Sequence, residues 1–561
     1  MTVTAPASVP SYGEVFTRPW VAALLLDLVG YITQEDLGAR RFLEPSCGSG
    51  AFLGPAVKRL IESANAKQRD PATLHDAVRA YDLRPENVAK ARILCRSILT
   101  AAGVSETTAD ELTRSWIKCA DFLLDDVEDI EIDFAVGNPP YIRYDDLTEE
   151  TAVAYRKTWL TMRGRGDIYV GFIERCLTML RDQGKLGFIC ADRWMRNQYG
   201  ADLRKLVANR FSVEHIWTMH DVDAFETQVS AYPAITVLAR SSQGEAVVAD
   251  TNSAFNETSA RELQDWAHGR RRVPTFSNES VKAHRVPHWF PGDELWPTGT
   301  PARLALIEYL NDNFAPIHDP VTTKTRVSIG VATGADKVYI TRDADVAEED
   351  RMLRLSMPED LKSGEFQWQG NYLVNPWNKD GSLVPLGDYP KLAAYLSRHP
   401  AVRKRHVALK TPNAWYRTID KVQFDLIARP KLLLQDMKAY INPVLEPGGC
   451  YPHHNLYYIV SDTWEMEVLG GILLSRIAQA FIEAYGVRMR GGTLRFQAQY
   501  LKQIKVPDPD SLSQETRQSL KDAFLERDVD AATKAAAKAY NIQLDEFELN
   551  SANQVPSTIK N

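Results

Sequence analysis

The fold class of this chain follows from one segment, Phe42-Leu43-Glu44-Pro45-Ser46-Cys47-Gly48-Ser49-Gly50-Ala51-Phe52-Leu53. Its apolar start predicts a buried strand, its glycines predict a tight turn, and the residues from Ala51 onward predict the start of a helix. Gly48 and Gly50 let the backbone approach a ligand without Cβ atoms in the way, and Glu44 offers a carboxylate to a positively charged group. No Lys-Ser or Lys-Thr pair follows, so the loop is not of the phosphate-binding type. The segment therefore indicates an α/β domain that binds a ligand at the carboxyl ends of its strands.

A second segment carries the chemistry. Phe134-Ala135-Val136-Gly137 predicts a short buried strand, and Asn138-Pro139-Pro140-Tyr141 follows it directly. The Asn138 side-chain oxygen and the Pro139 carbonyl can together accept both hydrogens of an exocyclic amine, which directs the nitrogen lone pair away from the ring. Tyr141 offers a flat face on which a base can stack. The structural alternative is an ordinary turn followed by a core aromatic residue, because Asn-Pro and Pro-Pro are common in loops.

Together the two motifs resemble those of a known family, the S-adenosylmethionine-dependent N6-adenine DNA methyltransferases of type II restriction-modification systems. The cofactor motif precedes the catalytic motif, and a long segment follows Tyr141, which is the order of the gamma class, the TaqI-like enzymes. The resemblance implies a Rossmann-like, seven-stranded α/β domain that binds S-adenosylmethionine. It also implies a following mixed α+β target-recognition domain, similar to the TaqI-like specificity domain.

The resemblance also implies roles for individual residues. Thr17, in Phe16-Thr17-Arg18-Pro19, resembles the threonine that helps to hold the cofactor, and Asp82 follows the second predicted strand, where an acid can accept from both ribose hydroxyls. Phe225, in the segment 224–230, resembles the second aromatic residue that stacks on the target base. The cofactor-binding set is Thr17, Glu44, Ser46, Cys47, Gly48, Gly50, Asp82, Asp121, Phe122 and Asn138, and the catalytic set is Asn138, Pro139 and Tyr141.

Some of these residues have a structural alternative. Asp121-Phe122 follows the predicted strand 117–120 and resembles the pair that contacts the cofactor adenine, but an Asp that caps a helix before a core Phe fits the same pattern. Asp167 is expected to cap a helix whose apolar stripe is mostly core. In the family this helix lies beside the methionine end of the cofactor, so Tyr169 and Phe172 are further site candidates.

The implied mechanism rotates an adenine out of duplex DNA, stacks it between Tyr141 and Phe225, and methylates its amine by direct displacement. The chain has no Pro-Cys dipeptide, which argues against cytosine C5 methylation through a cysteine nucleophile. It also lacks paired-cysteine zinc spacing, so no metal is expected. His453-His454 is read as structural or DNA-contacting, because adjacent side chains on a strand point to opposite faces.

Composition indicates a globular chain of two or three domains, with 561 residues, 44% hydrophobic residues and a net charge of −7. Double-stranded DNA remains the expected partner, because basic residues are concentrated in the carboxyl half, at 403–406 and 488–505. The structural alternative for each basic run is an ordinary solvated face, which is the usual state of isolated basic clusters. Six scattered cysteines, no signal-like start and no long apolar span predict a cytoplasmic protein without a membrane anchor.

The expected domains are a catalytic domain over 1–240, a polar and irregular connector over 241–314 that contains the basic run 270–272, a target-recognition domain over 315–510 and a helical tail over 511–561. Ile235-Thr236-Val237-Leu238 is expected to be the last long strand of the first domain. Residues 328–340 predict a hairpin with a glycine turn. Segments 430–434, 453–458, 491–496 and 500–501 resemble recurring elements of the specificity domain.

Two other functional classes share the Asn-Pro-Pro-Tyr motif or part of the fold. Enzymes that methylate a glutamine amide of a protein, or guanine in RNA, use the motif but are expected to be smaller. A DNA-binding module with a vestigial cofactor fold would need a damaged motif, and both central motifs are intact. Few residues precede Thr17, so we expect any cognate restriction endonuclease to be a separate chain.

Overall fold

The structure is a computed structural model, and it describes residues 15–125, 130–226, 232–269, 273–290, 294–297, 299–488, 494–547 and 549. The chain divides into two compact units, Met1–Pro301 (unit 1) and Ala302–Asn561 (unit 2). Three segments of interest in the sequence, 227–230, 270–272 and 491–493, lie outside the described residues.

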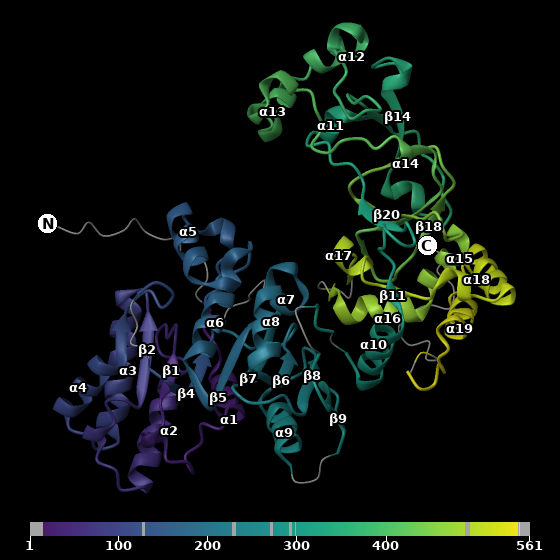
Figure 1. The fold of residues 1–561 in the computed structure, drawn as a ribbon. Helices are drawn as coiled ribbons and strands as arrows, with labels where there is room; N and C mark the ends of the chain where they lie inside the picture. The colour runs from purple at the N-terminus through teal and green to yellow at the C-terminus, as the bar shows by residue number, and fades with distance from the viewer. Residues whose placement is uncertain are drawn as a thin grey trace. The chain divides into compact units, whose positions relative to one another are not determined.

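Unit 1 is built on one ten-stranded sheet, in the order β3-β2-β1-β4-β5-β7-β6-β8-β10-β9, and most of these strands can be followed across Figure 1. The strands are β1 (Phe42–Glu44), β2 (Val78–Asp82), β3 (Ile117–Cys119), β4 (Ile132–Gly137), β5 (Leu180–Ala191), β6 (Ser212–Thr218), β7 (Pro233–Ala239), β8 (Ala246–Thr251), β9 (Thr275–Ser277) and β10 (Val281–Val286).

The first seven strands confirm the predicted Rossmann-like domain. β3, β2, β1, β4 and β5 run parallel, and β7 is antiparallel to both β5 and β6. Because the carboxyl ends of parallel strands meet at one edge of a sheet, the residues that follow β1 to β5 are brought together there.

Unit 1 also contains the helices α1 (Pro19–Leu28), α2 (Leu53–Ala66), α3 (Pro85–Ala101), α4 (Glu106–Trp116), α5 (Glu149–Thr158), α6 (Tyr169–Met179), α7 (Arg193–Arg196), α8 (Ala201–Arg210) and α9 (Glu257–His268). Local sequence fixes several starts. Pro19 and Pro85 occupy the first helical position, where the missing N–H costs nothing, and Ser105 caps α4 by accepting from the Thr108 N–H.

The segment after residue 240 differs from the irregular connector that the sequence predicts. β8 pairs in parallel with β6, and β10 and β9 continue the same sheet, so β7 is not the last long strand of this unit. Val247, Ala249, Val281 and Ala283 belong to the core of unit 1. The apolar faces of these strands therefore belong to the first unit, which ends at Pro301 rather than near Arg240.

Unit 2 contains several small sheets, ordered β11-β23, β12-β20-β16-β18, β13-β15-β14-β19 and β17-β22-β21. Their strands are β11 (Ala315–Pro316), β12 (Arg326–Ile329), β13 (Ile340–Thr341), β14 (Met352–Ser356), β15 (Tyr372–Val374), β16 (Lys431–Gln435), β17 (Met437–Lys438), β18 (Val444–Glu446), β19 (Tyr451–Pro452), β20 (Leu456–Val460), β21 (Val487–Arg488), β22 (Leu494–Arg495) and β23 (Lys505–Val506).

The hairpin predicted over 328–340 is wrong. β12 pairs with β20, and β13 pairs with β15 in another sheet. The glycine turn at Gly334, with φ of +73°, leads into the short helix α11 (Asp336–Tyr339) and not back along β12. Strand-forming residues on both sides of a glycine were compatible with either path.

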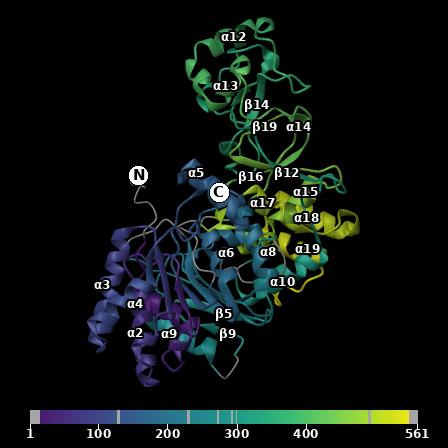
Figure 2. The same cartoon turned by 60° about the vertical axis from the view of Figure 1, so that its left-hand side comes forward.

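The remaining helices of unit 2 are α10 (Pro301–Asn313), α12 (Pro390–Ser397), α13 (His406–Lys410), α14 (Asp425–Ala428), α15 (Met466–Leu474), α16 (Arg476–Tyr485), α17 (Ala498–Leu501), α18 (Gln514–Glu526) and α19 (Val529–Tyr540). Figures 1 and 2 both place α12 and α13 at one end of unit 2, and α15, α18 and α19 at the other. α18 packs closely on α15, since a Cβ on Gly471 would lie 2.3 Å from the Leu520 carbonyl oxygen. The helices after residue 510 are thus part of the core of unit 2.

Within the described parts of the chain, no single helix is long and apolar enough to span a membrane. α15 and α16 together reach that length, but they are bent by 64° and their side chains are buried.

Candidate active site

The turn after β1 places backbone N–H groups beside the end of β2. The Cys47 N–H donates to the Tyr81 carbonyl at 2.8 Å, and the Gly48 N–H donates to Asp82 Oδ2 at 2.9 Å. Gly50 has φ of +103°, and a Cβ there would lie 2.8 Å from Leu94, so a larger residue would strain this turn. Burial, and then the nearby Glu44 and Asp82 carboxylates, raise the pKa of the Cys47 thiol well above its usual value. That thiol is consequently protonated and unreactive.

Glu44, the last residue of β1, is a buried carboxylate without a counter-ion among the residues that the structure describes. Its side chain is 1% exposed, and its Oε2 has no hydrogen-bond partner among the described residues. Burial raises the pKa of Glu44 well above its usual value, the nearby Asp82 raises it further, and the Leu53 N–H opposes the shift. Such a group fits a cationic ligand, because a bound ammonium would satisfy the free oxygen and stabilise the charge.

Asp82 lies at the carboxyl end of β2, as the sequence predicts. Its Oδ1 accepts from the Arg84 N–H and from Asn87 Nδ2, while Oδ2 holds the turn at Gly48. The carboxylate thus connects the glycine loop to the start of α3.

Asp121 and Phe122 follow β3, and both have protein partners. Asp121 accepts from the Leu123 N–H at 2.9 Å and from the Tyr155 hydroxyl at 3.0 Å. Phe122 is 2% exposed and stacks on Phe172, with ring centres 5.5 Å apart. This geometry is also that of the structural alternative, so the roles of Asp121 and Phe122 toward a cofactor adenine remain predictions.

The side-chain amide of Asn138 is held through its nitrogen, whereas its oxygen is unpaired within the described part of the chain. Its Nδ2 donates to the Val15 carbonyl at 3.1 Å and to Thr17 Oγ1 at 3.2 Å. Its Oδ1 is buried and has no hydrogen-bond partner in the described parts of the chain. Ser46 holds the same residue from the other side, by donating its hydroxyl to the Asn138 backbone carbonyl at 3.2 Å. The turn therefore presents one oriented acceptor with nothing to accept.

Pro139 and Tyr141 complete the turn. Pro139 is buried, and Tyr141 is half-buried with its hydroxyl 3.4 Å from the Ile189 carbonyl on β5. Burial raises the pKa of Tyr141 well above its usual value, so the ring stays neutral. A neutral ring held at its hydroxyl end offers a face for stacking.

The structure joins two motifs that are far apart in the sequence. Thr17 and Phe225 form an antiparallel bridge, in which the Arg18 N–H donates to the Ala224 carbonyl and the Glu226 N–H donates to the Phe16 carbonyl. Thr17 contacts Asn138, so this short pairing brings the Phe225 segment to the Asn138 turn. Phe225 itself is 5% exposed and packs in the core, and its stacking role remains a prediction.

The helix after Asp167 begins at Tyr169, and its N-cap is Ile168 without a side-chain cap. The prediction that Asp167 caps it is therefore wrong. Tyr169 is fully buried and shares a hydrogen bond with the Tyr199 hydroxyl at 2.8 Å, and Phe172 packs on Phe122. Both side chains have structural roles here.

A buried cluster that the sequence analysis missed follows β5. Asp192 lies 2.6 Å from Arg196 and 2.7 Å from His220 Nε2. Burial raises the pKa of Asp192, but the charges of Arg196 and His220 outweigh that effect and hold the pKa at about 2. Asp192 is the first acid after the predicted strand 185–190, so the rule that found Asp82 would also have found it.

The chain is similar in sequence to several restriction-modification methyltransferases. The family model described as Eco57I restriction-modification methylase matches residues 86–225. The chain is 40% identical over 540 residues to the type II methyltransferase M.PaeR7I of Pseudomonas aeruginosa, an alignment that covers 95% of this chain and 92% of the relative. It is 37% identical over 548 residues to M.BstVI of Geobacillus stearothermophilus, covering 96% and 97%. M.XhoI of Xanthomonas vasicola is also 37% identical, over 543 residues, covering 96% and 98%.

Among solved structures, the type IIL restriction-modification enzyme MmeI in complex with DNA is similar in fold. Its TM-score is 0.59 at 11% identity, over 95% of this chain and 74% of that one. The Rossmann-like strand order and the methyltransferase relatives identify S-adenosylmethionine as the cofactor, and the bare oxygens of Glu44 and Asn138 fit it. By near full-length similarity to M.PaeR7I, M.BstVI and M.XhoI, the chain belongs to the type II methyltransferases of restriction-modification systems.

Proposed function

We propose that this DNA methyltransferase transfers its methyl group to the exocyclic N6 of an adenine within a specific sequence of double-stranded DNA. The observation that carries the proposal is the Asn138 amide. Its nitrogen is tied to Val15 and Thr17, and its buried oxygen has no partner among the described residues. The amide oxygen is suited to accept a hydrogen from an amine. The amide nitrogen cannot donate to a substrate carbonyl, because both of its hydrogens are already used.

The chain's own residues then act on the target amine. Asn138 Oδ1 accepts one hydrogen and the Pro139 carbonyl accepts the other, which localises the lone pair on nitrogen. Tyr141 stacks on the extruded base and offsets the cost of unpairing, which is a few kcal/mol. Phe225 is the candidate for the opposite face. When bound, S-adenosylmethionine supplies a methyl group on a good leaving group. Glu44 would hold the amino group of S-adenosylmethionine, and the loop from Ser46 to Gly50 would line the site in which the cofactor lies.

Unit 2 is the part that we assign to target recognition. Sequence specificity needs side chains that reach base edges, and the catalytic residues all lie in unit 1. The three relatives match along unit 2 as well, as their coverage of the chain shows. A cognate restriction endonuclease on a separate chain is part of the proposal.

The test is methylation-sensitive long-read sequencing of plasmid DNA from cells that express this chain, with Asn138→Ala as the inactive variant. We expect one motif to carry N6-methyladenine at nearly every copy, and the mark to be absent with Asn138→Ala. A marked cytosine would contradict the adenine assignment. An unmarked plasmid with a folded, cofactor-bound enzyme would direct attention to RNA or a protein glutamine amide.

Thr17→Val tests whether Thr17 orients the Asn138 amide. The variant removes one hydrogen-bond acceptor while keeping the side-chain volume, at a cost of about 1 kcal/mol. We expect the single-turnover rate at saturating S-adenosylmethionine to fall about fivefold. Thr158→Val, at an exposed position of α5, is the matched control. A lower affinity for S-adenosylmethionine with an unchanged rate of methyl transfer would instead show that Thr17 only contacts the cofactor.

A further inference from the structure

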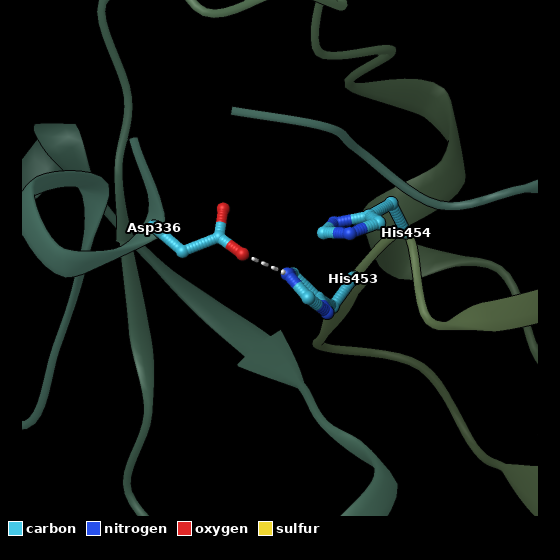
Figure 3. A group of neighbouring side chains, drawn as sticks. All are labelled: Asp336, His453 and His454. Atoms are coloured by element: carbon cyan, nitrogen blue, oxygen red, sulfur yellow. Dashed lines mark hydrogen bonds and ion pairs between the residues drawn. The ribbon is translucent and has the colours of Figure 1, made fainter. Parts of the chain in front are cut away.

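Three side chains of unit 2 meet at one point: Asp336, His453 and His454 (Figure 3). Asp336 begins α11, and the two histidines follow β19. The prediction that the histidines point to opposite faces is wrong, because β19 ends at Pro452 and the alternation of a strand no longer applies. Their ring centres lie 4.1 Å apart at 56°, so both rings face the same surroundings.

Backbone contacts fix the two segments that supply these side chains. The Val331 N–H donates to the Pro452 carbonyl at 2.9 Å, and the His454 N–H donates to the Val331 carbonyl at 3.1 Å. The backbones approach so closely at Gly330 that a Cβ there would lie 2.2 Å from the Pro452 carbonyl oxygen. The position of the histidines relative to the loop before α11 is therefore set by backbone hydrogen bonds and close packing.

The candidate ligand atoms of the three side chains lie close enough together to bind one metal ion after small side-chain movements. One atom from each side chain lies within 4.8 Å of the others. His453 Nε2 and Asp336 Oδ2 are 3.2 Å apart, and two ligands of a tetrahedral zinc ion lie about 3.3 Å apart. His454 Nδ1 is buried and has no hydrogen-bond partner in the described parts of the chain. That unsatisfied nitrogen is the feature that a simple His–Asp pair leaves unexplained.

The surroundings suit ligation. The Thr333 hydroxyl donates to the second oxygen of Asp336, which orients the carboxylate as outer partners of metal ligands do. Coordination through His453 Nε2 would place the ring proton on Nδ1 and give up the contact from the Asn455 N–H. At 3.4 Å that contact is long, so little is lost.

We propose that Asp336, His453 and His454 bind one divalent transition-metal ion of the zinc type, with water completing its coordination. Two imidazoles and one carboxylate favour such ions over Mg²⁺ and Ca²⁺, which prefer oxygen ligands. The ion would join segments that are 117 residues apart in the sequence. It would thereby stabilise the α11 region of unit 2 against the strand β19, independently of methyl transfer.

The test uses the full chain without a polyhistidine tag, stripped of metal with a chelator and titrated with Zn²⁺ by calorimetry. We expect one equivalent to bind, and the same one equivalent to raise the Tm. His454→Ala should weaken binding at least about tenfold and abolish the Tm shift. Asp336→Asn, at a side chain that is 43% exposed, is a second variant in case His454→Ala folds poorly. His406→Ala, an exposed histidine of the same unit, is the matched control and should bind like the wild type.

Two results would overturn the proposal. One is the lack of saturable one-to-one binding to the folded wild-type chain. The other is equal affinity for Zn²⁺ in the wild type, His454→Ala and Asp336→Asn.

Discussion

Asn138→Ala is expected to lower the rate of methyl transfer by about 10³-fold and to leave the affinity for S-adenosylmethionine nearly unchanged. The variant removes the bare acceptor that the turn after β4 presents. Removing one preorganised hydrogen-bonding group from an active site typically costs about 10²–10³ in rate, and this one acts on the reacting nitrogen itself. The variant leaves the Glu44 carboxylate and the contact between the Gly48 N–H and Asp82 in place, so cofactor binding should persist.

Single-turnover methylation of a duplex containing the target sequence measures the rate, and calorimetry measures the cofactor affinity. Asn65→Ala, an exposed position on α2 of the same unit, is the matched control and should behave like the wild type. Turnover in Asn138→Ala within a few-fold of the wild type would rule out the role of Asn138 in holding the amine.

Glu44→Gln should weaken S-adenosylmethionine binding by about 10- to 100-fold, because a hydrogen bond to a charged group contributes about 1.5–3 kcal/mol. It should also make the cofactor-free protein more stable at neutral pH. The wild-type carboxylate is buried, and one of its oxygens is unpaired among the described residues, while glutamine has nearly the same shape without the charge.

The pH dependence follows from the raised pKa of Glu44, whose first cause is burial and whose second is Asp82. The folded state holds this proton more tightly than the unfolded chain does. The contribution of Glu44 to stability is therefore full below its unfolded pKa, about 4.3, and is lost as the pH rises through the folded value. A bound ammonium favours the ionised form, so cofactor affinity should rise over that same interval.

Thermal unfolding without cofactor and calorimetric titration with cofactor, each over a range of pH, test both effects. The affinity of Glu44→Gln should depend less on pH than that of the wild type. Glu62→Gln, an exposed position on α2, is the control. A Glu44→Gln variant that binds as tightly as the wild type would show that the carboxylate does not hold the cofactor.

The sequence predicts those site residues whose position depends only on the strand next to them. Glu44 and Asp82 end short strands and Asn138 directly follows one, and parallel strands bring such residues to one edge. The pairing of strands that are distant in the sequence could not be predicted. β8 pairs with β6, although β7 lies between them in the sequence, and β12 pairs with β20 far along the chain. No local pattern specifies either pairing.

The prediction that His453 and His454 point to opposite faces was wrong for a related reason. The alternation rule is sound for strand residues, but the structure ends β19 at Pro452, one residue before His453. Boundaries of short elements depend on tertiary contacts, here the backbone bonds to Val331. The bare oxygen of Asn138 likewise depends on Val15 and Thr17, which lie more than a hundred residues before it.

The three strands that extend the sheet of unit 1 determine where this chain could be recombined with its relatives. A chimaera joined near residue 240 would pair β6 of one parent with β8 of the other, and it would pack Val247, Ala249, Val281 and Ala283 against a core from a different parent. Mismatched packing within one core lowers stability. Exchange of recognition domains to create new specificities should therefore place the crossover at Pro301, so that each half keeps its complete sheet.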